Sequence, residues 1–128
     1  MCSQNAGQNC IGIERLLVHR SQYDEVNQLI STRAHDLRVG AALSADGIGT
    51  GVDMGSMISR ERFQSLQDRI AAAVAQGGRV ELGGVPVSHV YLNNGAFFEP
   101  TIIGEVRRDM DIAQQECEFY LRTRDSNL

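Results

Sequence analysis

Residues 59–82 decide the fold and read SRERFQSLQDRIAAAVAQGGRVEL, a helix signal followed directly by a strand signal. Ser59 suits a helix N-cap, and Glu61 places a carboxylate in the first turn. Apolar side chains then recur at helical spacing and predict one buried face: Phe63, Leu66, Ile70, Ala73 and Val74. Two glycines at 77 and 78 supply the helix stop. Residues 79–82 alternate polar and apolar, which predicts a half-buried strand.

The segments on either side extend this pattern into an α/β fold. Residues 16–18 (LLV) form a short apolar run that predicts a buried strand. A helix is expected to open at Ser21, with Asp24 as a capping-box-like partner, and to close before Leu37. Residues 40–56 read as a glycine-rich loop, and residues 97–103 predict a further extended segment. Strands alternating with helices predict an α/β layer, a parallel-type sheet with flanking helices.

Composition excludes several classes of function. With 128 residues, 42% hydrophobic and 22% charged, the chain has the composition of one globular domain. A net charge of −4, and no basic run longer than the pair Arg107 and Arg108, argue against nucleic acid as a partner. No apolar run approaches the roughly 20 residues of a membrane span. All 12 cationic residues are arginines, which excludes lysine chemistry such as a Schiff base.

The cysteines and histidines predict neither a disulfide framework nor a metal site. The three cysteines, Cys2, Cys10 and Cys117, are too few and too scattered for either. This usage fits a reducing, intracellular compartment, and we expect the cytoplasm. His19, His35 and His89 show no metal-ligand spacing, so no metal is expected.

Residues 5–15 (NAGQNCIGIER) form the densest candidate site and surround Cys10 with small and amide residues. Flanking glycines let the backbone approach a ligand closely. A thiolate in such a loop is a nucleophile, and neighbouring N–H groups could hold a developing oxyanion. An inert small hydrophobe is the other interpretation that the residues themselves permit. A pair of Cys10 with His19 would lack an orienting residue. The glycines of residues 47–51 favour a flexible loop over a phosphate cradle.

Several ordered motifs resemble one known family. Residues 5–10 (NAGQNC), with Gly12 and the pair Glu14 and Arg15, resemble the cysteine signature of the NAD(P)-dependent aldehyde dehydrogenases. The resemblance continues in order through residues 37–40 (LRVG), 53–59 (DMGSMIS), 95–103 (GAFFEPTII) and 112–116 (IAQQE). Ser56 stands where this family usually has proline. The similarity extends from Asn5 to Cys117.

The resemblance implies a fold, a reaction and two site residues. Residues 1–117 would be part of an aldehyde dehydrogenase catalytic domain, incomplete at both ends, and residues 118–128 an atypical, disordered tail. Cys10 would attack an aldehyde to give a thiohemiacetal, hydride would pass to NAD or NADP, and water would hydrolyse the resulting thioester. Glu116 would bind the ribose beside the nicotinamide. The residues after it, Glu118 to Tyr120, depart from the family's Phe-Gly-Pro, so a solvated acid is the alternative for Glu116.

The same resemblance implies that the dinucleotide-binding domain lies outside this segment. We therefore expect the 128-residue chain to be inactive alone, although full-length relatives would be homo-oligomeric enzymes acting on small aldehydes. The second class of function that fits the sequence is a non-catalytic remnant or interaction module of the same fold.

Overall fold

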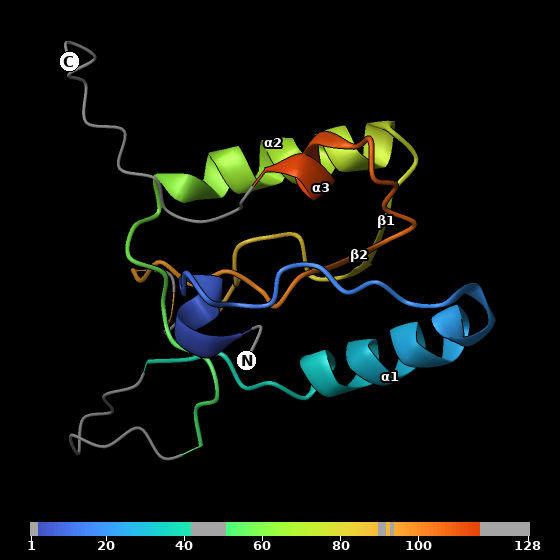
Figure 1. The fold of residues 1–128 in the computed structure, drawn as a ribbon. Helices are drawn as coiled ribbons and strands as arrows, with labels where there is room; N and C mark the ends of the chain where they lie inside the picture. The colour runs from blue at the N-terminus through green and yellow to red at the C-terminus, as the bar shows by residue number, and fades with distance from the viewer. Residues whose placement is uncertain (1–2, 42–50, 90–91, 93, 116–128) are drawn as a thin grey trace, which may run out of the picture.

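The computed structural model describes residues 3–41, 51–89, 92 and 94–115 (Figure 1). Two short 3-10 turns, η1 (Gln4–Gly7) and η2 (Arg20–Gln22), precede the first α-helix, α1 (Tyr23–His35). Then follow α2 (Arg62–Ala75), β1 (Arg79–Leu82), β2 (Ile102–Gly104) and α3 (Asp111–Gln114). Glu116, the predicted tail 118–128, and Gly47 and Gly49 of the glycine-rich loop lie outside the described residues.

Helix α2 and strand β1 lie where the local signals of the sequence predict them, but Val74 of the predicted buried face is 47% exposed. Ser59 Oγ accepts a hydrogen bond from Glu61 N at 3.1 Å and so caps the turn that leads into α2, although the N-cap residue of the helix itself is Glu61 and not Ser59 as predicted. At the other end Gly77 has φ of +101° and donates to Val74 O, while Gly78 N donates to Ala73 O at 2.8 Å. This pair of bonds satisfies the last carbonyls of the helix and turns the chain into β1.

The two strands form an antiparallel ribbon. Arg79 pairs with Gly104 and Val80 with Ile103, and an irregularity follows before Leu82. Among the described residues, parallel pairing is confined to an isolated bridge between Val39 and Met54. The α/β class is confirmed, but the predicted parallel pairing is wrong for β1 and β2. The described part of the connection between these strands contains no helix, and strands without a crossover helix between them can pair antiparallel.

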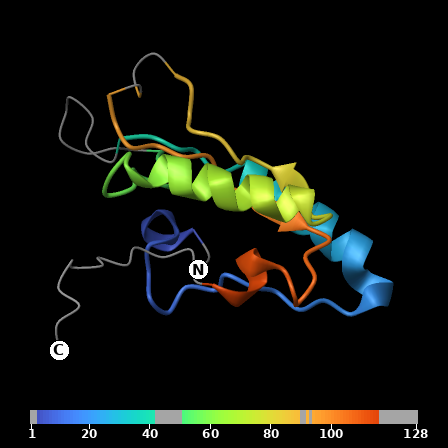
Figure 2. The ribbon, with the colours of Figure 1, turned by 90° about the horizontal axis from the view of Figure 1, so that it is seen from above.

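The core lies between α2 and the chain around Phe97. Helices α1 and α2 lie on opposite sides of the ribbon, and α3 lies beside α2 (Figures 1 and 2). The buried apolar side chains are Met54, Phe63, Ala73, Phe97, Phe98 and Met110. The rings of Phe63 and Phe98 meet with centroids 5.3 Å apart, which fastens α2 to the segment before β2. Within the described residues, none of the helices is long and apolar enough to cross a membrane.

The predicted buried strand at residues 16–18 is wrong. Leu16 is 60% exposed and Leu17 is 98% exposed, and the segment is irregular. An apolar run becomes a buried strand only beside a neighbouring strand, and none of the described residues pairs with it. The helix after it was predicted, but α1 begins at Tyr23 rather than at Ser21, and the side chain of its N-cap residue Gln22 makes no capping bond. His19 Nδ1 accepts a hydrogen bond from Ser21 N and caps the preceding turn η2.

Candidate functional site

A left-handed turn leads the chain to Cys10. Within η1, Asn5 and Ala6 have φ of 53° and 55°, and Gly7 has φ of 80°. Asparagine and glycine tolerate this region, whereas alanine in it costs about 1–2 kcal/mol. Hydrogen bonds in both directions hold the turn: Asn5 Nδ2 donates to Gln8 O at 3.2 Å, and Gln8 Nε2 donates to Asn5 O at 2.9 Å.

Cys10 occupies the second position of a tight turn, residues 9–12, which we name the Cys10 turn. Gly12 N donates to Asn9 O at 2.7 Å and closes it. The amide oxygen of Asn9 accepts from Ile11 N at 3.2 Å and lies 4.0 Å from Cys10 Sγ. Cys10 is exposed, as a thiol must be to meet a substrate.

One distant segment, around Ile58, anchors the chain directly before the Cys10 turn. Gln8 Oε1 accepts a hydrogen bond from Ile58 N at 2.9 Å, which ties the turn to the segment before α2. That segment is bonded in turn to the stretch before Phe97, through Met57 N to Ala96 O at 2.7 Å and Arg60 Nε to Gly95 O at 2.8 Å. Three of the sequence motifs therefore meet in space. Gln8, which joins two of them, was not predicted as a site residue.

An ion pair between Arg38 and Asp53 lies at the start of the segment that contains Ile58. The Arg38 guanidinium makes a bidentate contact with Asp53, with Nε 2.8 Å from Oδ2 and Nη2 3.0 Å from Oδ1. Arg38 N also donates to Asp53 Oδ2 at 3.0 Å. These hydrogen bonds favour the carboxylate and lower the pKa of Asp53 to about 2. The pair holds residue 53 in place, directly before the buried Met54.

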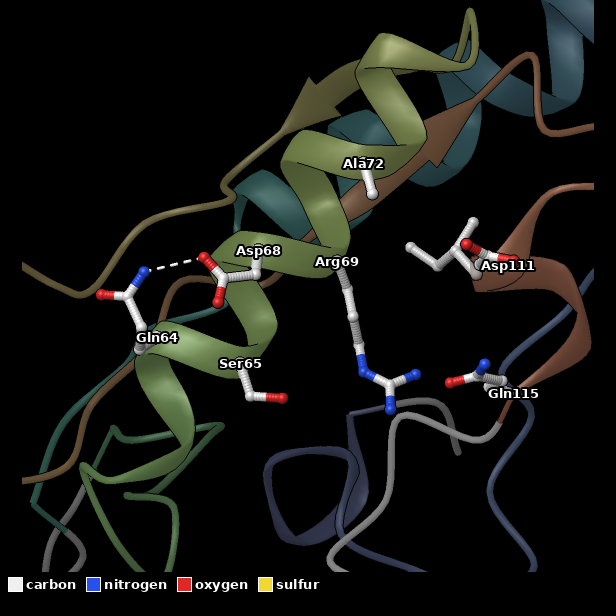
Figure 3. Close-up of a pocket in the computed structure, with 8 residues that line it drawn as sticks. Gln64, Ser65, Asp68, Arg69, Ala72, Asp111 and Gln115 are labelled. Carbon is white, nitrogen blue, oxygen red and sulfur yellow. Dashed lines mark hydrogen bonds between the residues drawn. The ribbon is translucent and has the colours of Figure 1, made fainter.

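A separate hollow of about 510 Å³ opens between α2 and α3 (Figure 3). Arg69 extends from α2 toward Gln115, while Asp68 accepts a hydrogen bond from Gln64 at 2.8 Å. Cys10 does not line this hollow, so we assign the hollow no part in the chemistry of the Cys10 thiol. In the part of the chain that the structure describes, no group of three His, Cys, Asp or Glu residues could hold a metal ion.

The described residues do not fit a dinucleotide cofactor. A dinucleotide site needs a strand, a glycine-rich turn and a helix whose N-terminus meets the phosphates. The two strands described are antiparallel and short, and the N-termini of α1 and α2 each follow a segment that is not a strand. Glu116, the predicted ribose ligand, lies outside the described residues.

Comparison with known proteins identifies the family. The sequence model of the aldehyde dehydrogenase family matches residues 1–118. A putative aldehyde dehydrogenase-like protein of Schizosaccharomyces pombe is 39% identical over 114 residues, covering 89% of this chain and 21% of the relative. A probable NADP(+) succinate-semialdehyde dehydrogenase of Sinorhizobium fredii is 33% identical, covering 88% of this chain and 21% of the relative. The chain belongs to the aldehyde dehydrogenase family.

Solved structures agree with this assignment. A betaine aldehyde dehydrogenase from Staphylococcus aureus, in complex with NAD+, superposes with a TM-score of 0.80 at 31% identity. The match covers 90% of this chain and 22% of that one. An aldehyde dehydrogenase mutant from Bacillus cereus gives a TM-score of 0.77 at 28% identity. The chain therefore spans about a fifth of the length of the proteins it matches.

Proposed function

We propose that this chain supplies the nucleophile of an enzyme that oxidises small aldehydes with NAD or NADP as acceptor, and that Cys10 is that nucleophile. The observation that carries the proposal is the exposed Cys10 thiol, held on a closed turn whose preceding residue, Gln8, is bonded to Ile58. Membership of the aldehyde dehydrogenase family supports the reaction class. An intracellular, cytoplasmic location belongs to the same proposal.

The reaction step that this chain's own residues would carry out is the addition of the Cys10 thiolate to the carbonyl group of an aldehyde. The Cys10 thiolate attacks the aldehyde carbon, a C–S bond forms, and the π electron pair moves to oxygen, which takes up a proton to give a thiohemiacetal. The backbone N–H of Cys10 makes no hydrogen bond within the described residues, so it is available to donate to that oxygen.

Oxidation of this adduct needs a hydride acceptor. Because the described residues offer no dinucleotide site, we derive no step through NAD or NADP, and we propose that the 128-residue chain alone produces no reduced nicotinamide. Aldehyde-dependent formation of reduced cofactor by the purified chain would contradict this part of the proposal.

Alkylation of the thiols tests the role of Cys10. Iodoacetamide labelling near neutral pH, mapped by mass spectrometry, gives separate rates for the three cysteines of one chain. We expect Cys10 to react faster than Cys117, and propanal to slow Cys10 selectively and saturably, whereas propanol, the matched alcohol, does not. Equal alkylation rates at Cys10 and Cys117, or equal slowing of both by propanal, would show that the Cys10 turn neither activates its thiol nor directs an aldehyde to it.

A non-catalytic interaction module is the second candidate function. The observation that favours it is the exposed apolar segment directly after the Cys10 turn.

A further inference from the structure

An asparagine followed by glycine, Asn94 and Gly95, lies in the turn before the buried Phe97. Asparagine is thermally labile, because its side-chain amide can react with the backbone nitrogen of the next residue. Glycine in that next position has no side chain to obstruct the approach. None of the other asparagines in the chain is followed by glycine. Residues 94 and 95 therefore form the candidate site for this reaction.

The fold requires glycine at position 95. A Cβ atom there would lie 2.6 Å from Cδ2 of Phe97 and closer still to Cε2 of the same ring. The Phe97 side chain belongs to the buried core, where it is 7% exposed. Because interiors are close-packed, the ring cannot move aside without disturbing its neighbours. Packing therefore keeps at position 95 the residue that leaves Asn94 most open to attack.

The surroundings of Asn94 leave its side chain able to reach the Gly95 nitrogen. Within the described residues the Asn94 carboxamide makes no hydrogen bond, and Asn94 is exposed in this chain. The Gly95 N–H donates to Leu92 O at 3.0 Å and must leave this acceptor before its nitrogen can attack. This bond closes a turn between residues only three positions apart, so it can open locally while the core stays folded. The reaction is intramolecular and needs only water besides.

We propose that Asn94 is a site of spontaneous deamidation, and that its isoaspartate product detaches residues 95 and 96 from residues 57–60. The Gly95 nitrogen attacks Cγ of Asn94, a C–N bond forms, and the side-chain nitrogen leaves as ammonia with the proton of the Gly95 N–H. Water then opens the cyclic imide at either of its two carbonyl groups, which gives aspartate or isoaspartate. Neither step involves Cys10, so this site is independent of the proposed aldehyde chemistry.

The two products differ in their effect on the main chain. Isoaspartate lengthens the main chain by one methylene group directly before Gly95. Gly95 O accepts a hydrogen bond from Arg60 Nε at 2.8 Å, and Ala96 O accepts one from Met57 N at 2.7 Å. Both bonds depend on the position and direction of these carbonyl groups, so the added methylene group weakens or breaks them. Aspartate keeps the length of the main chain and adds only a charge.

Peptide mapping by mass spectrometry, after incubation of the folded chain at mildly alkaline pH, tests the site. We expect position 94 to deamidate first. Asn5, Asn9 and Asn27 serve as references within the same chain, because each is followed by a residue with a side chain. Asn94→Gln should abolish the reaction, since its longer side chain must close a larger, slower-forming ring. Deamidation at position 94 no faster than at the three references, as it would be if the turn protects the amide, would overturn the proposal.

Urea unfolding of the separated products tests the structural consequence. Ion exchange isolates the deamidated chains by their additional negative charge, and labelling by an isoaspartate methyltransferase distinguishes isoaspartate from aspartate. Loss of one or two hydrogen bonds should lower the folding equilibrium constant of the isoaspartate form by about five- to thirtyfold. Asn94→Asp is the matched control for the charge and should stay within about twofold of the parent. An isoaspartate form as stable as the parent, or an Asn94→Asp variant destabilised to the same extent, would contradict the proposed detachment.

Discussion

Gly12→Ala should displace the Cys10 turn, and the size of the effect follows from one contact. A Cβ atom on Gly12 would lie 2.9 Å from Asn9 O, closer than Cβ atoms come to other atoms in real structures. Asn9 O is also the acceptor of the 2.7 Å hydrogen bond that closes the turn. The new methyl group must therefore push the acceptor away from its donor. Loss of a hydrogen bond of this kind lowers the free energy of unfolding by about 1 kcal/mol.

Gly55→Ala is the matched control. A Cβ atom there meets nothing within 4 Å, so the change should be neutral or stabilise the fold by up to about 1 kcal/mol through the unfolded chain. In urea unfolding, the free energies of unfolding of the two variants should differ by about 1–2 kcal/mol, with Gly12→Ala the less stable. Only Gly12→Ala should change the alkylation rate of Cys10. Equal stabilities with unchanged alkylation in both variants would refute the steric argument.

Two further predictions concern the ion pair and the core. The pKa of Asp53 is about 2 in the folded chain and 3.8 ordinarily. The ion pair therefore stabilises the folded chain above pH about 4, and this stabilisation is lost as the pH falls toward 2. The unfolding temperatures of the parent and Asp53→Asn should differ near pH 6 and converge near pH 2. Met110 is 1% exposed, so Met110→Ala should cost about 2–5 kcal/mol in chemical unfolding, whereas Met110→Leu, which keeps the volume, should cost less than about 1.5 kcal/mol. A gap that persists to pH 2, or equal costs for both Met110 variants, would contradict these expectations.

The elements that the sequence predicts well are those with local causes. Helix α2 and strand β1 are joined by two glycines whose bonds to Ala73 and Val74 involve neighbouring residues only. The prediction of a strand at residues 16–18 fails for a non-local reason. A strand needs a second strand beside it, and the sequence does not show which segment lies there. The short helix α3 was not predicted, since its four residues are too few for a periodic pattern.

In the candidate site, too, some residues can be identified from the sequence and others only from the folded structure. Cys10 is identified by resemblance, since a lone exposed cysteine carries no signal of its own. The contact from Ile58 N to Gln8 Oε1 joins residues 50 positions apart. A glutamine in a polar loop gives no sign of its partner, so only the folded structure shows that Gln8 anchors the turn. The roles of Glu116 and of residues 118–128 stay predictions.

The position of the Cys10 thiol depends on the core as well as on its own turn. Gln8 holds the turn to Ile58, and residues 57–60 are held to Gly95 and Ala96 by backbone acceptors. Directly beyond these anchors, Phe63 is the first buried residue of α2, and its ring packs at a tilt of 60° against the ring of Phe98. The aromatic contact therefore helps to hold residues 57–60, to which Gln8 is bonded, beside residues 95 and 96. Because interiors are close-packed and transmit displacement, a change at this ring pair reaches the thiol through two short hydrogen-bonded steps.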